Sequence, residues 1–175
     1  MSRTVRRWLA LAASVGDAAF RVAYTDDMGA TAWTVVTISA TVAEGGTGPK
    51  SLFALDSQHI WACSTTGDVY FSSDGGETWT DQNAAGVSGG IQLNALSFID
   101  EEIGYAVGNT DTIIYTTDGG LHWAAAMATG TGDDLLAVTC FSQYRLLVGT
   151  DNATLGGSLW ISFDGTTTWE ERPVS

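Results

Sequence analysis

Apolar and polar residues alternate in short runs along this chain, and turns rich in Gly, Asp and Ser separate the runs. A two-residue alternation predicts strands with one buried face. The runs fall into four similar units. The third strand of each unit carries an apolar pair two places apart, and the equivalent pairs are Val22 and Tyr24, Val69 and Phe71, Ile113 and Tyr115, and Leu159 and Ile161. No stretch has a helical period, so we expect no helix.

The units span about residues 1–40, 51–83, 93–127 and 135–172 of one domain, 1–175. The first unit has no room for a first strand, so it is expected to be incomplete. The expected strands are Arg7–Ser14, Phe20–Thr25, Trp33–Ser39, Ser51–Asp56, His59–Ser64, Asp68–Ser73, Thr78–Gln82, Leu93–Ile99, Ile103–Val107, Thr112–Thr117, His122–Met127, Leu135–Phe141, Tyr144–Gly149, Ser158–Phe163 and Thr168–Arg172.

The same turn follows the third strand of every unit: a Ser or Thr, an Asp two places later, a Gly two after that, and a Trp three further on. The Asp carboxylate can accept hydrogen bonds from turn amides, and Gly tolerates the positive φ of a tight hairpin. The first copy has one extra residue before its Trp, and Thr166 stands at the second Gly position of the last. The turn residues are Thr25, Asp27, Gly29, Trp33, Ser72, Asp74, Gly76, Trp79, Thr116, Asp118, Gly120, Trp123, Ser162, Asp164 and Trp169.

The four turn tryptophans are 46, 44 and 46 residues apart. A fixed period in this range indicates an array of supersecondary units, each unable to bury its apolar face alone. The pattern assigns no role to Trp8 or Trp61. We align Ala12-Ala13-Ser14 with Ala62-Cys63-Ser64, Ala106-Val107-Gly108 and Leu147-Val148-Gly149 in the second strands.

The repeated turn resembles the Asp-box of the BNR repeat, found in sialidases, sortilin-type receptors, xyloglucanases and photosystem II assembly factors. In those proteins the box joins the third and fourth strands of a β-propeller blade, away from the active face. The resemblance implies an all-β fold, a propeller of about four Asp-box blades with the first blade incomplete. It gives Asp74, Asp118 and Asp164 a structural role and no catalytic one.

An incomplete first blade leaves three possibilities. The chain could close a small ring, copies of the chain could build a larger one, or another chain could supply the missing strand. The N-terminal arginines Arg3, Arg6 and Arg7 would suit an acidic neighbouring surface in such an assembly, so we expect protein partners, including further copies of this chain.

Charge is unevenly distributed along the chain. The formal net charge is −13; residues 1–50 hold five basic and four acidic residues, whereas residues 51–175 hold two basic and 16 acidic ones. Nucleic acid and anionic membrane are therefore poor partners. No apolar run is long enough to span a bilayer. The N-terminal stretch imitates a signal peptide, but its alignment with later repeats favours a strand.

Few residues suit an active site. Three convergent arginines of the sialidase kind are missing from the sequence. A xyloglucanase-like carboxylate pair could come from Asp100, Glu101, Glu102, Asp133 and Asp134, although these lie in polar turns. His59 and His122 lack the spacing of a zinc site. We expect no cofactor, with Ca²⁺ in the acidic loops a weak alternative, and Cys63 and Cys140 as small buried thiols.

The sequence therefore favours a non-enzymatic structural or interaction module, with a virion or cell-surface assembly as the favoured setting. A propeller displays loops from many blades on one face, which suits binding of proteins or sugars. A carbohydrate-binding propeller, or a glycoside hydrolase related to sialidases or xyloglucanases, is the alternative.

Overall fold

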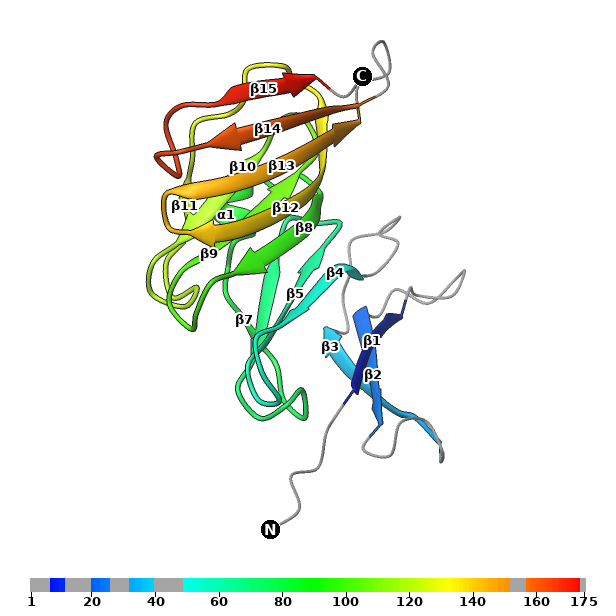
Figure 1. Ribbon diagram of the computed structural model, residues 1–175. Helices are drawn as coiled ribbons and strands as arrows, with labels where there is room; N and C mark the ends of the chain where they lie inside the picture. The colour runs from blue at the N-terminus through cyan, green and yellow to red at the C-terminus, as the bar shows by residue number, and fades with distance from the viewer. Residues whose placement is uncertain (1–6, 12–19, 26–31, 40–48, 152–156, 174–175) are drawn as a thin grey trace.

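The computed structural model describes residues 7–11, 20–25, 32–39, 49–151 and 157–173, which form four antiparallel sheets (Figure 1). The first sheet contains β1 (Arg7–Leu11), β2 (Phe20–Thr25) and β3 (Thr34–Ser39). The second contains β4 (Pro49–Ala54), β5 (Ile60–Ser64), β6 (Val69–Ser72) and β7 (Thr80–Asp81). The third contains β8 (Leu93–Phe98), β9 (Gly104–Gly108), β10 (Ile113–Thr116) and β11 (Ala124–Ala125). The fourth contains β12 (Asp134–Ser142), β13 (Arg145–Asp151), β14 (Ser158–Ser162) and β15 (Glu170–Pro173).

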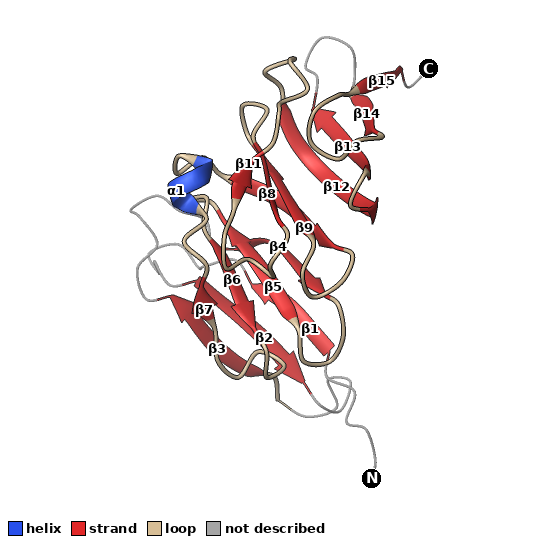
Figure 2. Cartoon of the chain, turned by 90° about the vertical axis from the view of Figure 1, so that its left-hand side faces the viewer, coloured by secondary structure: helices blue, strands red, loops and turns tan. Residues whose placement is uncertain are grey.

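The sheets are stacked in chain order as blades of an incomplete β-propeller (Figures 1 and 2). Within each sheet every strand pairs with its neighbours in sequence. The innermost strands β4, β8 and β12 carry the contacts between successive sheets, with β1 against β4. Within the described residues no comparable contact joins the fourth sheet to the first, and Figure 1 places these two sheets at opposite ends of the arc. The described blades therefore do not close a ring.

The all-β prediction is confirmed, and so is the three-stranded first blade. Strand positions agree within a few residues, except that β1 ends at Leu11 and residues 12–14 lie outside the described part. The expectation of no helix was wrong in one place, because a single turn, α1 (Ala85–Ser88), connects the second and third sheets and ends at Gly89 with φ 69°. No described helix could cross a membrane.

Strand register corrects the alignment of the second strands and places the two unassigned tryptophans at equivalent positions. The turn hydroxyl residues Thr25, Ser72, Thr116 and Ser162 pair with Arg7, Ile60, Gly104 and Leu146. The next position holds Trp8, Trp61, Tyr105 and Leu147. The residues equivalent to Ala62 and Ala106 are thus Leu9 and Val148, not Ala12 and Leu147. The predicted alignment was displaced because small residues recur at several neighbouring positions.

Apolar side chains fill the spaces between consecutive sheets. Between the second and third, Trp61 is fully buried and stacks on Phe98 with ring centroids 3.9 Å apart. Between the third and fourth, Tyr105, Val107 and Ile113 pack against buried residues of β12 and β13. Trp61 is therefore a core residue, which the sequence pattern had not shown.

The two cysteines are free thiols, as expected. Cys63 is fully buried on β5, and Cys140 is partly buried on β12, where its thiol donates to the Ser97 carbonyl across the interface between the third and fourth sheets. Burial raises the pKa of each thiol to about 12, which keeps both thiols neutral.

Candidate functional site

The second turn shows how the repeated motif folds. The Ser72 hydroxyl donates to Asp74 Oδ1 at 2.8 Å and accepts the Gly76 amide at 2.6 Å. The Asp74 carboxylate accepts the Thr78 amide and hydroxyl, at 2.9 and 2.6 Å. The Trp79 indole Nε1 donates a hydrogen bond to the Gly76 carbonyl, which closes the turn. Each conspicuous residue of the motif thus has a partner inside the turn.

The third and fourth turns repeat the hydroxyl and carboxylate bonds of this network but not its indole bond. The Trp169 indole donates to the Met127 carbonyl, and the buried Trp123 indole has no partner among the described residues. Thr116 accepts the Gly120 amide, and Asp118 accepts the His122 amide and ring. Ser162 and Asp164 make the corresponding bonds to Gly165, Thr167 and Thr168. In the first turn Thr25 is buried and Trp33 is 42% exposed, while Asp27 and Gly29 lie outside the described residues.

The turn carboxylates are held ionised. Partial burial acts to raise the pKa of Asp74, but hydrogen bonds from Thr78 and Ser72 outweigh it and lower that pKa to about 2. The His122 amide and ring lower the pKa of Asp118 to about 2. The Thr168 amide is the main cause that lowers the pKa of Asp164. A general acid needs a raised pKa, so these groups are unsuited to that role.

The turns are attached to the preceding hairpin of their own blade. The Gly75 amide donates to the Gln58 carbonyl and the Gly119 amide to the Glu102 carbonyl. Gly119 has φ 75°, and a Cβ there would lie 2.7 Å from the Glu101 carbonyl oxygen, so only glycine fits. The turns between first and second strands therefore lie at the same end of the blades as the Asp-box turns.

This arrangement separates the candidate carboxylates. Asp100, Glu101 and Glu102 follow the inner strand β8, whereas Asp133 and Asp134 lie at the beginning of the next inner strand, β12. Since neighbouring inner strands of a meander propeller run in the same direction, the two groups lie at opposite ends, about 20 Å apart for six residues of strand. Asp100 accepts the Glu102 and Ile103 amides, and Asp134 accepts the Thr110 amide.

One carboxylate of the first group does meet a histidine. Three side chains from the second and third sheets each offer one atom that could bind a metal ion, and these atoms lie within 4.8 Å of one another. They belong to Asp56, His59 and Glu101. The His59 ring donates from Nδ1 to Asp56 at 2.9 Å, and this bond is the main cause that lowers the pKa of Asp56 to about 2. These are donors that could hold a divalent cation. Sequence reasoning missed the cluster because Glu101 is 42 positions from His59 and only blade stacking brings them together.

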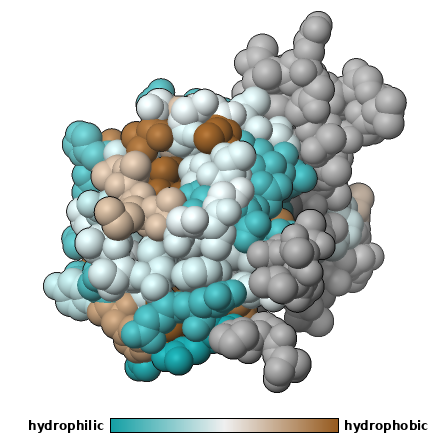
Figure 3. Space-filling model, turned by 90° about the horizontal axis from the view of Figure 1, so that it is seen from above, coloured by the Kyte–Doolittle hydropathy of each residue, from teal (hydrophilic) through white to brown (hydrophobic). Residues whose placement is uncertain are grey.

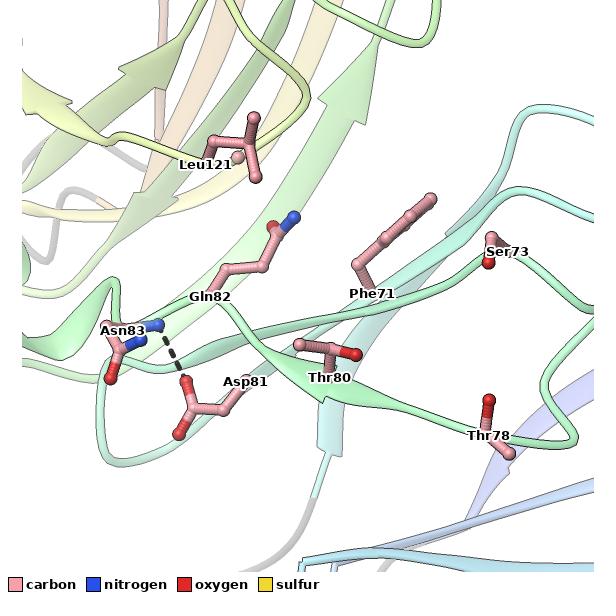
Figure 4. Close-up of a pocket in the computed structure, with 9 residues that line it drawn as sticks. Phe71, Ser73, Thr78, Thr80, Asp81, Gln82, Asn83 and Leu121 are labelled. Carbon is pink, nitrogen blue, oxygen red and sulfur yellow. Dashed lines mark hydrogen bonds between the residues drawn. The ribbon is translucent and has the colours of Figure 1, made fainter.

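A pocket of about 300 Å³ lies between the second and third sheets (Figure 4). Phe71 and Leu121 provide apolar walls, and the Gln82 side chain crosses between the sheets to donate to the Gly119 carbonyl at 2.6 Å. Hydroxyl, amide and carboxylate groups complete the lining. The other lining residues are Ser73, Thr78, Thr80, Asp81, Asn83 and Gly120. None of the candidate carboxylates named from the sequence lines it.

The outward face of the fourth sheet differs from the equivalent face of the third, because no other described sheet packs on it. Register places Thr139, Leu147 and Ile161 in one row and Ala137, Gly149 and Leu159 in the next. Leu159 is 38% exposed, and at the ends of these strands Phe141 is 62% and Phe163 49% exposed. Hydrophobic patches interrupt the hydrophilic surface seen in Figure 3.

Neither protein-family models nor curated protein sequences match this chain. Solved structures do. YCF48 bound to D1 peptide is 15% identical over 98% of this chain and 45% of its own, with a TM-score of 0.61. A GH74 xyloglucanase from Xanthomonas campestris is 18% identical over 94% and 28%, with a TM-score of 0.64. A Trypanosoma rangeli sialidase mutant with trans-sialidase activity is 13% identical over 98% and 36%, with a TM-score of 0.53.

These similarities establish the fold. The resemblance to Asp-box propellers is confirmed at that level, since the matches are propellers of the groups that the repeated turn implied. The chain spans between about a quarter and half of the length of the structures it matches. They include glycoside hydrolases as well as a protein with a bound peptide.

Proposed function

We propose that this protein is a non-enzymatic interaction module that binds protein through the outward face of the fourth sheet. The proposal rests on one comparison between equivalent positions of the repeat. Leu159 in the fourth sheet is 38% exposed, whereas Ile113 in the third sheet, which the fourth sheet covers, is 3% exposed. Covering a sheet face that carries apolar residues stabilises the resulting complex by about 25 cal/mol for each Å² of apolar surface buried.

The bonding of the carboxylates supports a non-catalytic role. Asp100 and Asp134 are each engaged by backbone amides of their own or a neighbouring turn. The two groups of acids lie at opposite ends of the inner strands, whereas paired glycosidase carboxylates are about 5 to 10 Å apart. Arg145 lies 5.4 Å from the Phe163 ring centroid and Arg172 pairs with Glu170, so neither contributes to an arginine cluster.

The peptide bound to YCF48 is consistent with protein binding by this fold. A virion or cell-surface assembly is the setting we favour for the module. That setting rests on the chain's acidity, with a formal net charge of −13, and the proposal of a binding module does not depend on it.

The size of the native complex tests the proposal. The tagged chain, expressed in its own host, should elute from extracts well above 18.4 kDa, and Leu159→Asp should shift it to the size of a single chain. Leu121→Asp is the matched control, because Leu121 is 79% exposed on the third Asp-box turn, away from this face. A complex of unchanged size in Leu159→Asp would refute the proposal, as would turnover of sialosides or β-glucans by the purified chain.

The second candidate function is carbohydrate binding, with a sugar ring in the pocket shown in Figure 4. The pocket combines the Phe71 ring with the polar groups of Thr80, Asp81 and Asn83, the mixture that carbohydrate sites use. Calorimetric titration with xyloglucan oligosaccharides and sialyllactose should then show binding that Phe71→Leu and Asp81→Asn weaken. Equal binding by the variants, or none by the wild type, would reject this site.

A further inference from the structure

We infer that a Zn²⁺ ion binds between the second and third sheets, held by Asp56, His59 and Glu101, and that it joins the two sheets. The inference concerns a different part of the molecule from the fourth sheet and does not depend on the proposed function. It assigns a metal ion to a chain for which the sequence predicted no cofactor.

The three side chains come from equivalent turns of two neighbouring blades. Asp56 and His59 lie between β4 and β5, and Glu101 lies between β8 and β9. The His59 Nδ1 atom is 2.9 Å from Asp56 Oδ2 and 3.7 Å from Glu101 Oε1. Atoms that bind one tetrahedral zinc ion are about 3.4 Å apart. An ion among these atoms therefore requires only a small movement of Glu101, whose side chain is 64% exposed.

Neighbouring groups hold two of the three side chains in place. Asp56 Oδ1 accepts the Gln58 and His59 amides at 2.7 and 2.8 Å, while Asp56 Oδ2 meets the His59 ring. That ring stacks on Phe71, with planes 9° apart and centroids 6.1 Å apart. Ligands that are oriented before binding lose less conformational freedom when the ion arrives. When zinc binds Nδ1, the proton that Nδ1 donates to Asp56 moves to Nε2, so the ion replaces that proton between the two side chains.

The aspartate has a role in the turn that does not require a metal ion. Register makes residues 55–59, 99–103 and 141–145 equivalent. Asp100 in the second of these turns accepts two backbone amides, as Asp56 does in the first. The aspartate alone therefore does not indicate a site.

The histidine and the glutamate have no such role in the repeat. At the interface between the third and fourth sheets, the position of His59 holds Ile103, which packs against the apolar core there. The position of Glu101 holds Gln143. The fold thus accepts an uncharged pair at these positions, whereas the interface between the second and third sheets brings an imidazole and two carboxylates together.

The second histidine of the chain provides a contrast. His122 Nδ1 lies 2.6 Å from Asp118 Oδ2, but the His122 side chain is 88% exposed. Within the part of the chain that the structure describes, no third metal-binding side chain joins this pair. His122 can therefore serve as a control for zinc binding by an ordinary surface histidine.

The types of ligand favour zinc over magnesium and calcium. Imidazole nitrogen is a good ligand for Zn²⁺, whereas Mg²⁺ and Ca²⁺ prefer sites made of oxygen atoms alone. Zinc usually takes four ligands, so three protein side chains leave one position for water. The Asp56 and Glu101 side chains are 48% and 64% exposed, which gives water access to that position.

Calorimetric titration of the purified, untagged full-length chain with zinc chloride tests the site. The wild type should bind one ion per chain with micromolar affinity. His59→Gln and Glu101→Gln should each weaken binding at least about tenfold, because each removes a ligand. Mg²⁺ and Ca²⁺ should bind at least about tenfold more weakly than Zn²⁺.

Asp100→Asn and His122→Gln are the matched controls. Asp100 has the same turn bonds as Asp56 without a histidine beside it, and His122 has a carboxylate without a third ligand. Both variants should keep the wild-type affinity for zinc within about twofold, since neither residue touches the ion.

Thermal unfolding tests whether the ion joins the two sheets. At a zinc concentration about a hundredfold above Kd, the midpoint of the wild type should rise by about 5 to 10 °C. Glu101→Gln should show no such rise, because its remaining ligands belong to the second sheet alone. Glu101 is exposed, so this variant keeps its fold.

Three results would overturn the inference. They are no binding by the wild type at about 100 μM zinc, equal binding by Glu101→Gln, and equal losses in Asp100→Asn and Glu101→Gln. Calcium binding as tight as zinc binding would overturn the choice of metal. None of these results bears on the proposed function or on the arginines predicted for assembly, of which Arg3 and Arg6 lie outside the described residues and Arg7 begins β1.

Discussion

The third and fourth sheets are built from the same repeat and differ in what lies beyond them. Ile113 and Leu159 occupy one position, at 3% and 38% exposure, and Tyr105 and Leu147 occupy another. The third sheet has large residues at these positions because the fourth sheet covers them. Leu147, Leu159 and Ile161 lie on a face that no neighbouring sheet covers within the described chain, which is the basis of the proposed binding surface.

The largest expected effect is on the stability of a variant in the buried face of the third sheet, compared with the same substitution in the fourth. Ile113→Asp should lower the free energy of unfolding by about 4 kcal/mol or more, because it buries a charge without a partner. Leu159→Asp should cost less than about 1 kcal/mol when measured on the single chain, since the residue is already exposed. Urea unfolding at a concentration below association measures both. Equal losses would mean that the two faces are equally covered.

The Asp-box tryptophans extend the comparison to the turns. Trp123 is 8% exposed between the second and third sheets, so Trp123→Ala should destabilise by about 3 to 5 kcal/mol. Trp33 is 42% exposed in the first sheet, and Trp33→Ala should cost about 1 kcal/mol in the single chain. Thermal unfolding followed by tryptophan fluorescence provides the measurement. A stable Trp123→Ala variant would contradict the structural role of the box.

Removing a turn carboxylate should have a smaller effect. Asp74→Ala leaves the Thr78 amide and the Ser72 hydroxyl without their acceptor, which should cost about 1 to 2 kcal/mol. Denaturant titration measures this loss. Glu77→Ala is the reference variant, because Glu77 is an exposed residue of the same turn. Parity between the two variants would show that the carboxylate does not stabilise the turn.

The same carboxylates should produce an acid-sensitive contribution to stability. The pKa values of Asp74 and Asp118 are lowered from 3.8 to about 2 in the folded chain. A lowered folded pKa contributes stability that is complete above pH 4 to 5 and is lost as pH falls through 3.8 towards 2. The difference in urea midpoint between the wild type and Asp74→Asn/Asp118→Asn should therefore narrow below about pH 4. A difference independent of pH would contradict this assignment.

The smallest effect is expected at the exposed ends of the third sheet. Glu101→Gln should change stability by no more than about 0.5 kcal/mol, because its side chain is 64% exposed and 3.7 Å from His59. Chemical denaturation of Glu101→Gln beside His59→Gln would measure this pair. A loss above about 1 kcal/mol would show that Glu101 and His59 join the second and third sheets more strongly than an exposed pair can.

Candidate-site prediction from sequence succeeded for local features. The spacing of Ser72, Asp74, Gly76 and Trp79 predicted the turn because the hydrogen bonds of these four residues that define it form within eight residues.

The sequence places the candidate carboxylates in polar turns. The structure has Asp100, Glu101 and Glu102 between β8 and β9 but Asp134 as the first residue of β12, and the sequence could not show which of them lie together. Whether Asp100 and Asp134 lie close together depends on the direction of strands in two different sheets. The sequence around each residue does not encode this relative direction.

The sequence alone determined the repeat, its strands and the incomplete first blade, since alternation and turn chemistry are local and recur every 44 to 46 residues. The tertiary structure decided the register that makes Trp8 and Trp61 equivalent, the meeting of His59 with Glu101, and which blade face remains open. These features depend on how one sheet stacks on the next. Stacking buries any apolar face that has a neighbour, so residues at equivalent positions of the repeat are core in the third blade and surface in the fourth.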